Sequence, residues 1–104
     1  MALIIQKSYN ESEEKWIMVL EGEVDLHTAD QLKEAVNQML SEKIEDVKIL
    51  GDRLDYIDST GLSVFISALK KLQKENKNII LKNMKPSIKK LLNITGLDKI
   101  IIME

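Results

Sequence analysis

The chain of 104 residues contains no cysteine, one proline, one histidine and four aromatic residues. Without cysteine it can form neither disulfides, thiolate nucleophiles nor zinc–thiolate sites. No hydrophobic run approaches the roughly 18 apolar residues that a membrane-spanning helix needs. The short apolar run at residues 2–5 has no basic segment before it, as a signal peptide would have. These absences predict a cytoplasmic protein without a membrane span.

The charges are nearly balanced, with 15 Lys and Arg against 17 Asp and Glu and a net charge of −2. Nucleic-acid-binding domains usually carry a basic face, so we do not expect this chain to bind nucleic acid. The lysine pairs at 70–71 and 89–90 fall in helical patterns and are interpreted as solvated helix faces. A chain of this length can bury one core without disulfides or metals, which predicts a single domain over residues 1–104.

The hydrophobic pattern alternates between strands and helices. The expected strands cover residues 2–9, 16–22, 46–51, 79–82 and 98–103, and the expected helices begin at Thr28, at Gly61 and near Pro86. The continuous apolar run at 16–22 is typical of a strand buried on both faces. The order β-β-α-β-α-β-α-β predicts an α/β fold with mainly parallel strands and crossover helices. The turn between the first two strands favours an antiparallel pair.

Helical periodicity also predicts which residues pack inward. The inward set of the first helix is Ala29, Leu32, Val36, Met39 and Leu40, and that of the second is Leu62, Phe65, Ile66, Leu69 and Leu72. Thr28 and Gln31 have the spacing of a capping box at the start of the first helix. Pro86 near the start of the third helix and Gly96 just past its end are in the usual positions for both residue types.

One stretch, YIDSTGLSVF at residues 56–65, passes from the end of a strand into a helix. An acid, two hydroxyls and a glycine, Asp58-Ser59-Thr60-Gly61, stand at the transition. Asp, Ser and Thr are all favoured helix caps, but a helix needs only one of them. A helix N-terminus also offers free N–H groups and a partial positive charge, which would accommodate a phosphate on Ser59. The added charge would then repel a partner that accepts the neutral hydroxyl.

A hydrolase is the catalytic alternative, with Ser59, His27 and an acid as a triad. Ser59 does not lie in a Gly-x-Ser-x-Gly elbow. The four glycines are too scattered for a phosphate-binding loop, and no His, Asp and Glu cluster has the spacing of a metal site. We therefore expect neither an enzyme nor a bound cofactor or metal.

Two segments, LEGEVDLHTADQLKEAV and YIDSTGLSVFISALKKLQ, resemble the STAS domain, and specifically the bacterial anti-sigma factor antagonists, also called anti-anti-sigma factors. The segment LKNMKPSIKKLLNITGLDKII resembles their C-terminal part, so the similarity covers nearly the whole chain. The motif Asp-Ser-Thr-Gly-Leu at 58–62 is its most characteristic element, and Gly-Glu-Val-Asp at 22–25 adds to it. The resemblance implies a small mixed β-sheet with helices packed mainly on one face.

The resemblance implies a binding module. Unphosphorylated members bind an anti-sigma factor that is also a serine kinase with a histidine-kinase-like ATP fold, and this binding releases the sigma factor. The kinase phosphorylates the serine directly after the motif aspartate, which corresponds to Ser59 here, and the complex then breaks. A metal-dependent PP2C-type phosphatase reverses the step. ATP and Mg²⁺ belong to those enzymes, so the resemblance implies no cofactor for this chain.

The resemblance also assigns roles to the neighbours of Ser59. Asp25, Asp58 and Thr60 are expected to contribute to the partner-binding surface. Gly61 and Leu62 are expected to be structural. An unswitched role, as a STAS interaction subunit of a transporter or a stressosome-like sensory complex, is the alternative within the same family.

Two departures from the family are visible. Leu50-Gly51-Asp52 follows the central strand where members often have an acidic or amide residue, so we expect a differently shaped loop below Ser59. Many members continue into a helix beyond the last strand, whereas this sequence ends at Glu104. Apolar surface left open by a missing helix would suit a homodimer.

Overall fold

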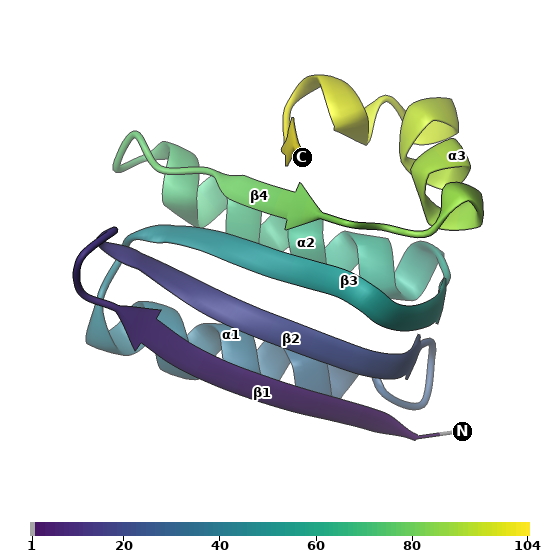
Figure 1. Ribbon diagram of the computed structural model, residues 1–104, viewed down its shortest axis with the longest axis horizontal. Coiled ribbons are helices and arrows are strands. Elements are labelled where there is room, and N and C mark those ends of the chain that lie inside the picture. The colour runs from purple at the N-terminus through teal and green to yellow at the C-terminus, as the bar shows by residue number, and fades with distance from the viewer. Residues whose placement is uncertain (1) are drawn as a thin grey trace.

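The computed structural model describes residues 2–104, so residue 1 of the predicted domain lies outside the described residues. The described residues form a five-stranded sheet of order β1-β2-β3-β4-β5 (Figure 1). The strands are β1 (Leu3–Asn10), β2 (Lys15–Val24), β3 (Asp46–Ile57), β4 (Ile79–Lys82) and β5 (Ile102–Met103). The helices are α1 (Ala29–Glu42), α2 (Ser59–Gln73) and α3 (Pro86–Thr95), and a short 3₁₀ turn, η1 (Leu97–Lys99), follows α3.

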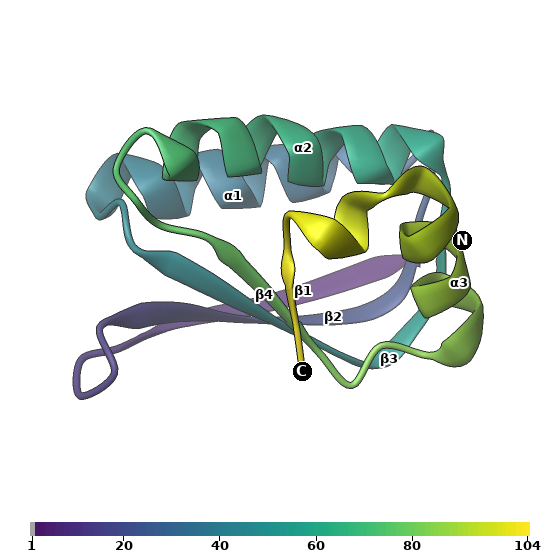
Figure 2. The same cartoon turned by 90° about the horizontal axis from the view of Figure 1, so that it is seen from above.

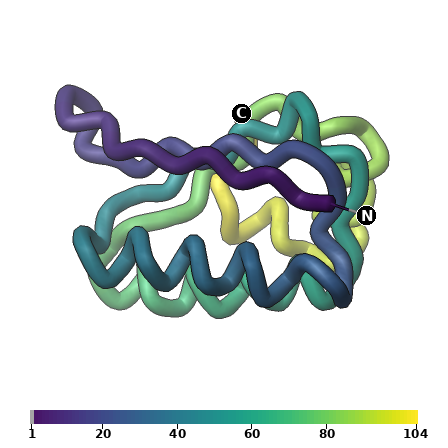
Figure 3. The backbone as a smooth tube through the Cα atoms, turned by 90° about the horizontal axis from the view of Figure 1, so that it is seen from below, coloured from purple at the N-terminus to yellow at the C-terminus, as the bar shows by residue number. Residues whose placement is uncertain are grey.

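The sheet is mixed. β1 pairs antiparallel with β2, while β2, β3, β4 and β5 pair parallel to their neighbours. α1 and α2 lie side by side on one face of the sheet (Figures 2 and 3), and among residues 2–104 no helix covers the opposite face. The predicted α/β architecture, with an antiparallel first pair and helices mainly on one face, is confirmed.

The two long helices bury the faces that periodicity predicts, with one exception. All five residues predicted for α1 are buried. In α2, Leu62, Phe65 and Leu69 are buried as predicted, but Ile66 is 36% exposed. The buried stripe of α2 also takes in Ala68, so Ile66 lies at its edge and faces solvent.

The prediction that residues 16–22 are buried on both faces is wrong. Trp16, Met18 and Leu20 are buried, whereas Ile17 and Val19 between them are only half-buried. Alternate residues of a strand point to opposite faces, and the helices cover only one face of this sheet. The continuous apolar run therefore has one fully buried side.

β3 is longer than predicted and continues from residue 51 to Ile57. The differently shaped loop expected after the central strand, from Asp52, is absent because the strand continues through these residues. The pairing of β3 with β2 shifts register twice, between Val19 and Glu21 and between Gly22 and Glu23. Such shifts are typical of β-bulges. A Cβ on Gly51 would lie 2.4 Å from the Met84 sulfur, so a larger residue here would require the Met84 side chain to move.

The predicted last strand, residues 98–103, is mostly wrong. Gly96 adopts a left-handed conformation with φ of 78° and ends α3, and the chain then forms the turn η1. The Ile101 N–H donates to the Leu97 carbonyl at 3.0 Å, and both side chains are buried. Only Ile102 and Met103 remain to pair with β4. Ile100 and Ile102 are exposed, and the homodimer contact stays a prediction.

Candidate functional site

The two motif segments meet at one end of the sheet. β2 and β3 run parallel, and Val24 pairs with Ile57 at their carboxyl ends. The next residues along the chain are Asp25 and Asp58, and the Asp58 N–H donates to the Val24 carbonyl at 3.1 Å. The carboxyl ends of parallel strands are where α/β folds commonly place their functional loops. The N-termini of α1 and α2 lie at this same end of the sheet (Figure 1).

Asp58 is the N-cap of α2. Its Oδ1 accepts hydrogen bonds from the backbone N–H groups of Thr60 at 2.9 Å and Gly61 at 3.1 Å. The Leu62 N–H closes the first helical turn on the Asp58 carbonyl at 3.0 Å. Ser59 is therefore the first residue of the helix rather than its cap, and it is exposed. Of the three residues able to cap, the helix uses the acid.

This cap changes how a phosphate on Ser59 would be held. The helix start was expected to offer this phosphate free N–H groups, but Asp58 already binds two of them. The partial positive charge of the helix terminus remains favourable. A phosphate at this position would also stand next to the Asp58 carboxylate, which caps the helix.

Asp25 organises the loop between β2 and α1. Its Oδ1 accepts from the backbone N–H groups of His27 at 2.8 Å and Thr28 at 3.2 Å. The bond from the His27 N–H is the main cause that lowers the pKa of the Asp25 carboxyl below its ordinary value. The Asp25 carboxylate therefore has a local structural task in addition to any contact with a partner.

The predicted capping box at the start of α1 is wrong, although the helix begins one residue after Thr28, close to the prediction. The Thr28 hydroxyl donates to the Glu23 carbonyl at 2.8 Å and accepts from the Asp25 N–H at 2.9 Å. The Gln31 side chain donates instead to the Leu3 carbonyl at 2.9 Å, and so fastens α1 to β1. Both side chains serve contacts to neighbouring strands and loops that a local pattern cannot reveal.

Gly61 and Leu62 pack the start of α2 closely against the ends of β2 and β3. A Cβ on Gly61 would lie 2.6 Å from Cγ1 of Ile57 and 2.6 Å from Cγ1 of Val24. Leu62 is buried in the core below. The helix start can approach β2 and β3 this closely only because position 61 has no side chain.

The remaining site residues flank the cap. Thr60 is half-buried, and its carbonyl accepts from the Ser63 hydroxyl at 2.6 Å. His27, the histidine of the hydrolase alternative, is exposed on the loop after Asp25. Within residues 2–104 no group of three or more His, Cys, Asp or Glu side chains is placed to hold a metal ion.

Leu26, between Asp25 and His27, is a residue of this loop that the sequence motifs do not single out. Its side chain is 72% exposed, the highest value among the large hydrophobic side chains that the structure describes as exposed. The only signal in the sequence is an apolar residue inside an otherwise polar turn.

Comparison with known proteins identifies the family. Residues 6–104 match the family model of the STAS domain. The chain belongs to the STAS domain family. It is 37% identical over 76 residues to the anti-sigma-B factor antagonist of Staphylococcus epidermidis, a match that covers 73% of this chain and 70% of that protein. The corresponding protein of Staphylococcus aureus is 33% identical over the same length. The predicted family is confirmed.

Similarity to solved structures confirms the fold. The anti-sigma factor antagonist SpoIIAA in its unphosphorylated form superposes with a TM-score of 0.77 at 20% identity, over 97% of this chain and 87% of that one. Bacillus SpoIIAA in its phosphorylated form gives 0.74 at 20% identity, over 97% and 91%. An anti-sigma factor antagonist from Mycobacterium paratuberculosis gives 0.83 at 20% identity, over 98% and 85%.

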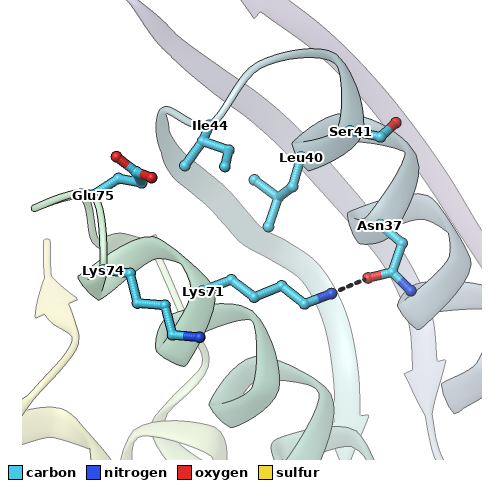
Figure 4. A pocket seen from close by; sticks show the side chains of 7 residues that line it. All are labelled: Asn37, Leu40, Ser41, Ile44, Lys71, Lys74 and Glu75. Atoms are coloured by element: carbon cyan, nitrogen blue, oxygen red, sulfur yellow. Dashed lines mark hydrogen bonds between the residues drawn. The ribbon is translucent and has the colours of Figure 1, made fainter.

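This STAS domain also has a groove at its other end (Figure 4). It has a volume of about 330 Å³ and is lined by Asn37, Leu40, Ser41, Ile44, Lys71, Lys74 and Glu75. The Lys71 ammonium donates to the Asn37 side-chain oxygen at 3.0 Å and joins the two helices across it. These residues belong to the C-terminal ends of α1 and α2 and the turns that follow, whereas Asp58 and Ser59 lie at the opposite end of α2. The groove is therefore separate from the motif residues.

None of the helices in residues 2–104 has the length and hydrophobicity that a membrane-spanning helix needs.

Proposed function

We propose that this STAS domain is an anti-sigma factor antagonist that is switched by phosphorylation of Ser59. In its unphosphorylated form it binds an anti-sigma factor that is also a serine kinase, and this releases the sigma factor. The observation that carries the proposal is that Asp58, and not Ser59, caps the start of α2. Asp58 supplies the cap, so the exposed Ser59 hydroxyl has no capping task and is available to a kinase.

The switch acts through charge at the binding surface. A phosphate adds about −1.5 to −2 charges at neutral pH. On Ser59 these charges would stand beside Asp58, at the same end of the sheet as Asp25. A partner surface that fits the neutral hydroxyl would then face repulsion and a desolvation cost. Asp25, Asp58 and Thr60 are the residues we assign to this surface.

The names of the relatives support the proposal. The matched staphylococcal proteins are anti-sigma-B factor antagonists, and SpoIIAA has been solved in both an unphosphorylated and a phosphorylated form. We assign the phosphorylation to a kinase with a histidine-kinase-like ATP fold and the reversal to a PP2C-type phosphatase. ATP and Mg²⁺ would be bound by those enzymes.

The test is the intact mass of the protein after incubation with ATP, Mg²⁺ and each histidine-kinase-like anti-sigma factor of its own host. Wild type should gain one phosphate, about 80 Da, with one of these kinases. Ser59→Ala, which keeps the Asp58 cap, should gain none. An unchanged wild-type mass with every kinase would contradict the switch and favour an unswitched STAS interaction subunit of a transporter or sensory complex.

A further inference from the structure

Leu26 stands out on the surface that carries Ser59. Single exposed apolar side chains are common on proteins and need a further argument before a role is assigned. Three observations support a role for Leu26: its side chain is 72% exposed, its loop is held by hydrogen bonds, and charged residues lie near it. The loop adjoins the phosphoacceptor helix, because Val24, two residues before Leu26, accepts the hydrogen bond of the Asp58 N–H at 3.1 Å.

The loop that displays Leu26 is fixed by hydrogen bonds on both sides of it. The Asp25 carboxylate holds the N–H groups of His27 and Thr28. The buried Thr28 hydroxyl binds back to Glu23 and to the Asp25 N–H. Ordering a flexible loop on binding costs free energy, and a loop that is already ordered avoids most of this cost. Leu26 is thus presented to solvent from a prearranged position.

Acidic residues precede and follow Leu26 along the chain. Asp25 precedes it, Glu23 lies just before in the strand, and Asp30 is in the first turn of α1. Asp58 lies on the adjoining strand end. His27 directly follows Leu26 and is also exposed. An exposed apolar side chain with acidic residues nearby is complementary to an apolar socket with a basic rim.

We propose that Leu26 is the anchor by which this surface binds its anti-sigma factor, and that the anti-sigma factor presents an apolar socket bordered by lysine or arginine side chains. This inference rests on the proposed function, because it names the contact through which the same partner binds. Its content is separate from the switch: Leu26 supplies affinity, whereas Ser59 decides whether binding is allowed.

The experiment compares Leu26→Ser with Ile94→Ser, a matched control on α3 whose side chain is 69% exposed. The probe is the host anti-sigma factor that phosphorylates Ser59, and calorimetry gives the dissociation constants. Leu26→Ser should bind at least about tenfold more weakly, and Ile94→Ser within about twofold of wild type. Leu26→Met, which keeps a large apolar side chain, should restore binding. Wild-type affinity should also fall with added salt, as basic-rim contacts are screened.

Phosphorylation kinetics provide a second readout. A docking residue should change the KM for this protein as a substrate and leave kcat within about twofold, because it contributes binding and not chemistry. All three variants should keep the wild-type melting temperature, since both positions are exposed.

Four outcomes would overturn the inference. Equal affinities for Leu26→Ser and wild type, while Ser59→Asp still weakens binding, would reject Leu26 as the anchor and leave the proposed function standing. Equal losses in Leu26→Ser and Ile94→Ser would reject a specific socket. Loss of self-association in Leu26→Ser, measured by sedimentation of the protein alone, would assign the side chain to a second copy of the chain. Failure of wild type to bind any host anti-sigma factor would overturn both the proposed function and the inference.

Discussion

Asp58 and Ser59 are adjacent in sequence and differ in task. The aspartate faces the helix and binds two of its N–H groups, while the serine is exposed. A modification of Ser59 can therefore alter the surface without removing the cap that starts α2. Substitutions at the two positions should separate stability from binding.

At Asp58, removal of the cap should be measurable by urea unfolding. Asp58→Ala loses both hydrogen bonds that Oδ1 accepts and should lower the free energy of unfolding by about 1 kcal/mol. Asp58→Asn keeps a cap of similar quality and should stay within a few tenths of a kcal/mol, roughly, of wild type. An alanine variant as stable as wild type would contradict the capping role. In binding assays, Asp58→Asn then tests the negative charge at position 58 without loss of the cap.

At Gly61, the sign of the stability change tests the packing argument. Replacing glycine by alanine within a helix ordinarily stabilises it by roughly 0.5–1 kcal/mol. Here the new Cβ would lie 2.6 Å from side-chain atoms of both Ile57 and Val24. Overpacking of this kind costs about 1–3 kcal/mol, so Gly61→Ala should be destabilised overall.

Ser67→Ala is the control for Gly61→Ala, because Ser67 is exposed on the same helix. It should be neutral or slightly stabilised in the same urea titration. A Gly61→Ala protein more stable than wild type would show that the helix start is not tightly packed.

At the scale of elements, a polar cluster joins the segments at the end of the sheet opposite Ser59. The Tyr9 hydroxyl donates to Glu45 at 3.1 Å, and Lys77 pairs with the other oxygen of Glu45 at 3.0 Å. The Trp16 ring N–H donates to the Lys43 carbonyl at 3.0 Å. The cluster thus connects β1 and β2 with the turns that follow α1 and α2.

Glu45 should make the stability of these connections depend on pH. The hydrogen bond from Lys77, followed by that from Tyr9, lowers the pKa of the Glu45 carboxyl below its ordinary value of 4.5. A carboxyl with a lowered pKa in the folded state stabilises the protein above the ordinary value. This stabilisation is lost progressively as the pH falls from there through the lowered pKa.

Glu45→Gln should therefore melt at a lower temperature than wild type at neutral pH, with the difference shrinking in acid. The measurement is the melting temperature between about pH 3 and pH 7. Glu13→Gln is the control, since Glu13 is exposed and its distance to Lys15 is a longer 3.7 Å. A constant difference between Glu45→Gln and wild type across this range would contradict the assigned coupling.

At the scale of the whole molecule, periodicity was enough to predict the alternation of strands and helices, because each element has an apolar face of its own. Periodicity failed for segments whose secondary structure depends on contacts with residues far away in the sequence. β3 continues through Asp52, Arg53 and Asp55 because these charged side chains are exposed while Leu54 and Ile57 remain buried. Near the C-terminus, most of the predicted strand 98–103 is a turn because Leu97 and Ile101 are both buried in the core, and only Ile102 and Met103 form a strand.

Part of the candidate site could likewise be predicted from the sequence, and part could not. The motif at 58–62 is contiguous, so its residues could be found in the sequence. Which residue caps the helix could not, because Asp, Ser and Thr are all competent. The juxtaposition of Asp25 and Asp58 depends on the pairing of Val24 with Ile57, which joins parts of the chain that are far apart in sequence.

The central claim is that phosphorylation of Ser59 changes binding and not folding. The most direct measurement takes the purified protein with and without phosphate on Ser59, and determines both its melting temperature and its dissociation constant for the anti-sigma factor. We expect melting temperatures within about 4 °C, a stability change below roughly 1 kcal/mol. We expect affinity to fall at least about tenfold, or 1.4 kcal/mol. Unchanged affinity, or a large loss of stability on phosphorylation, would contradict the account.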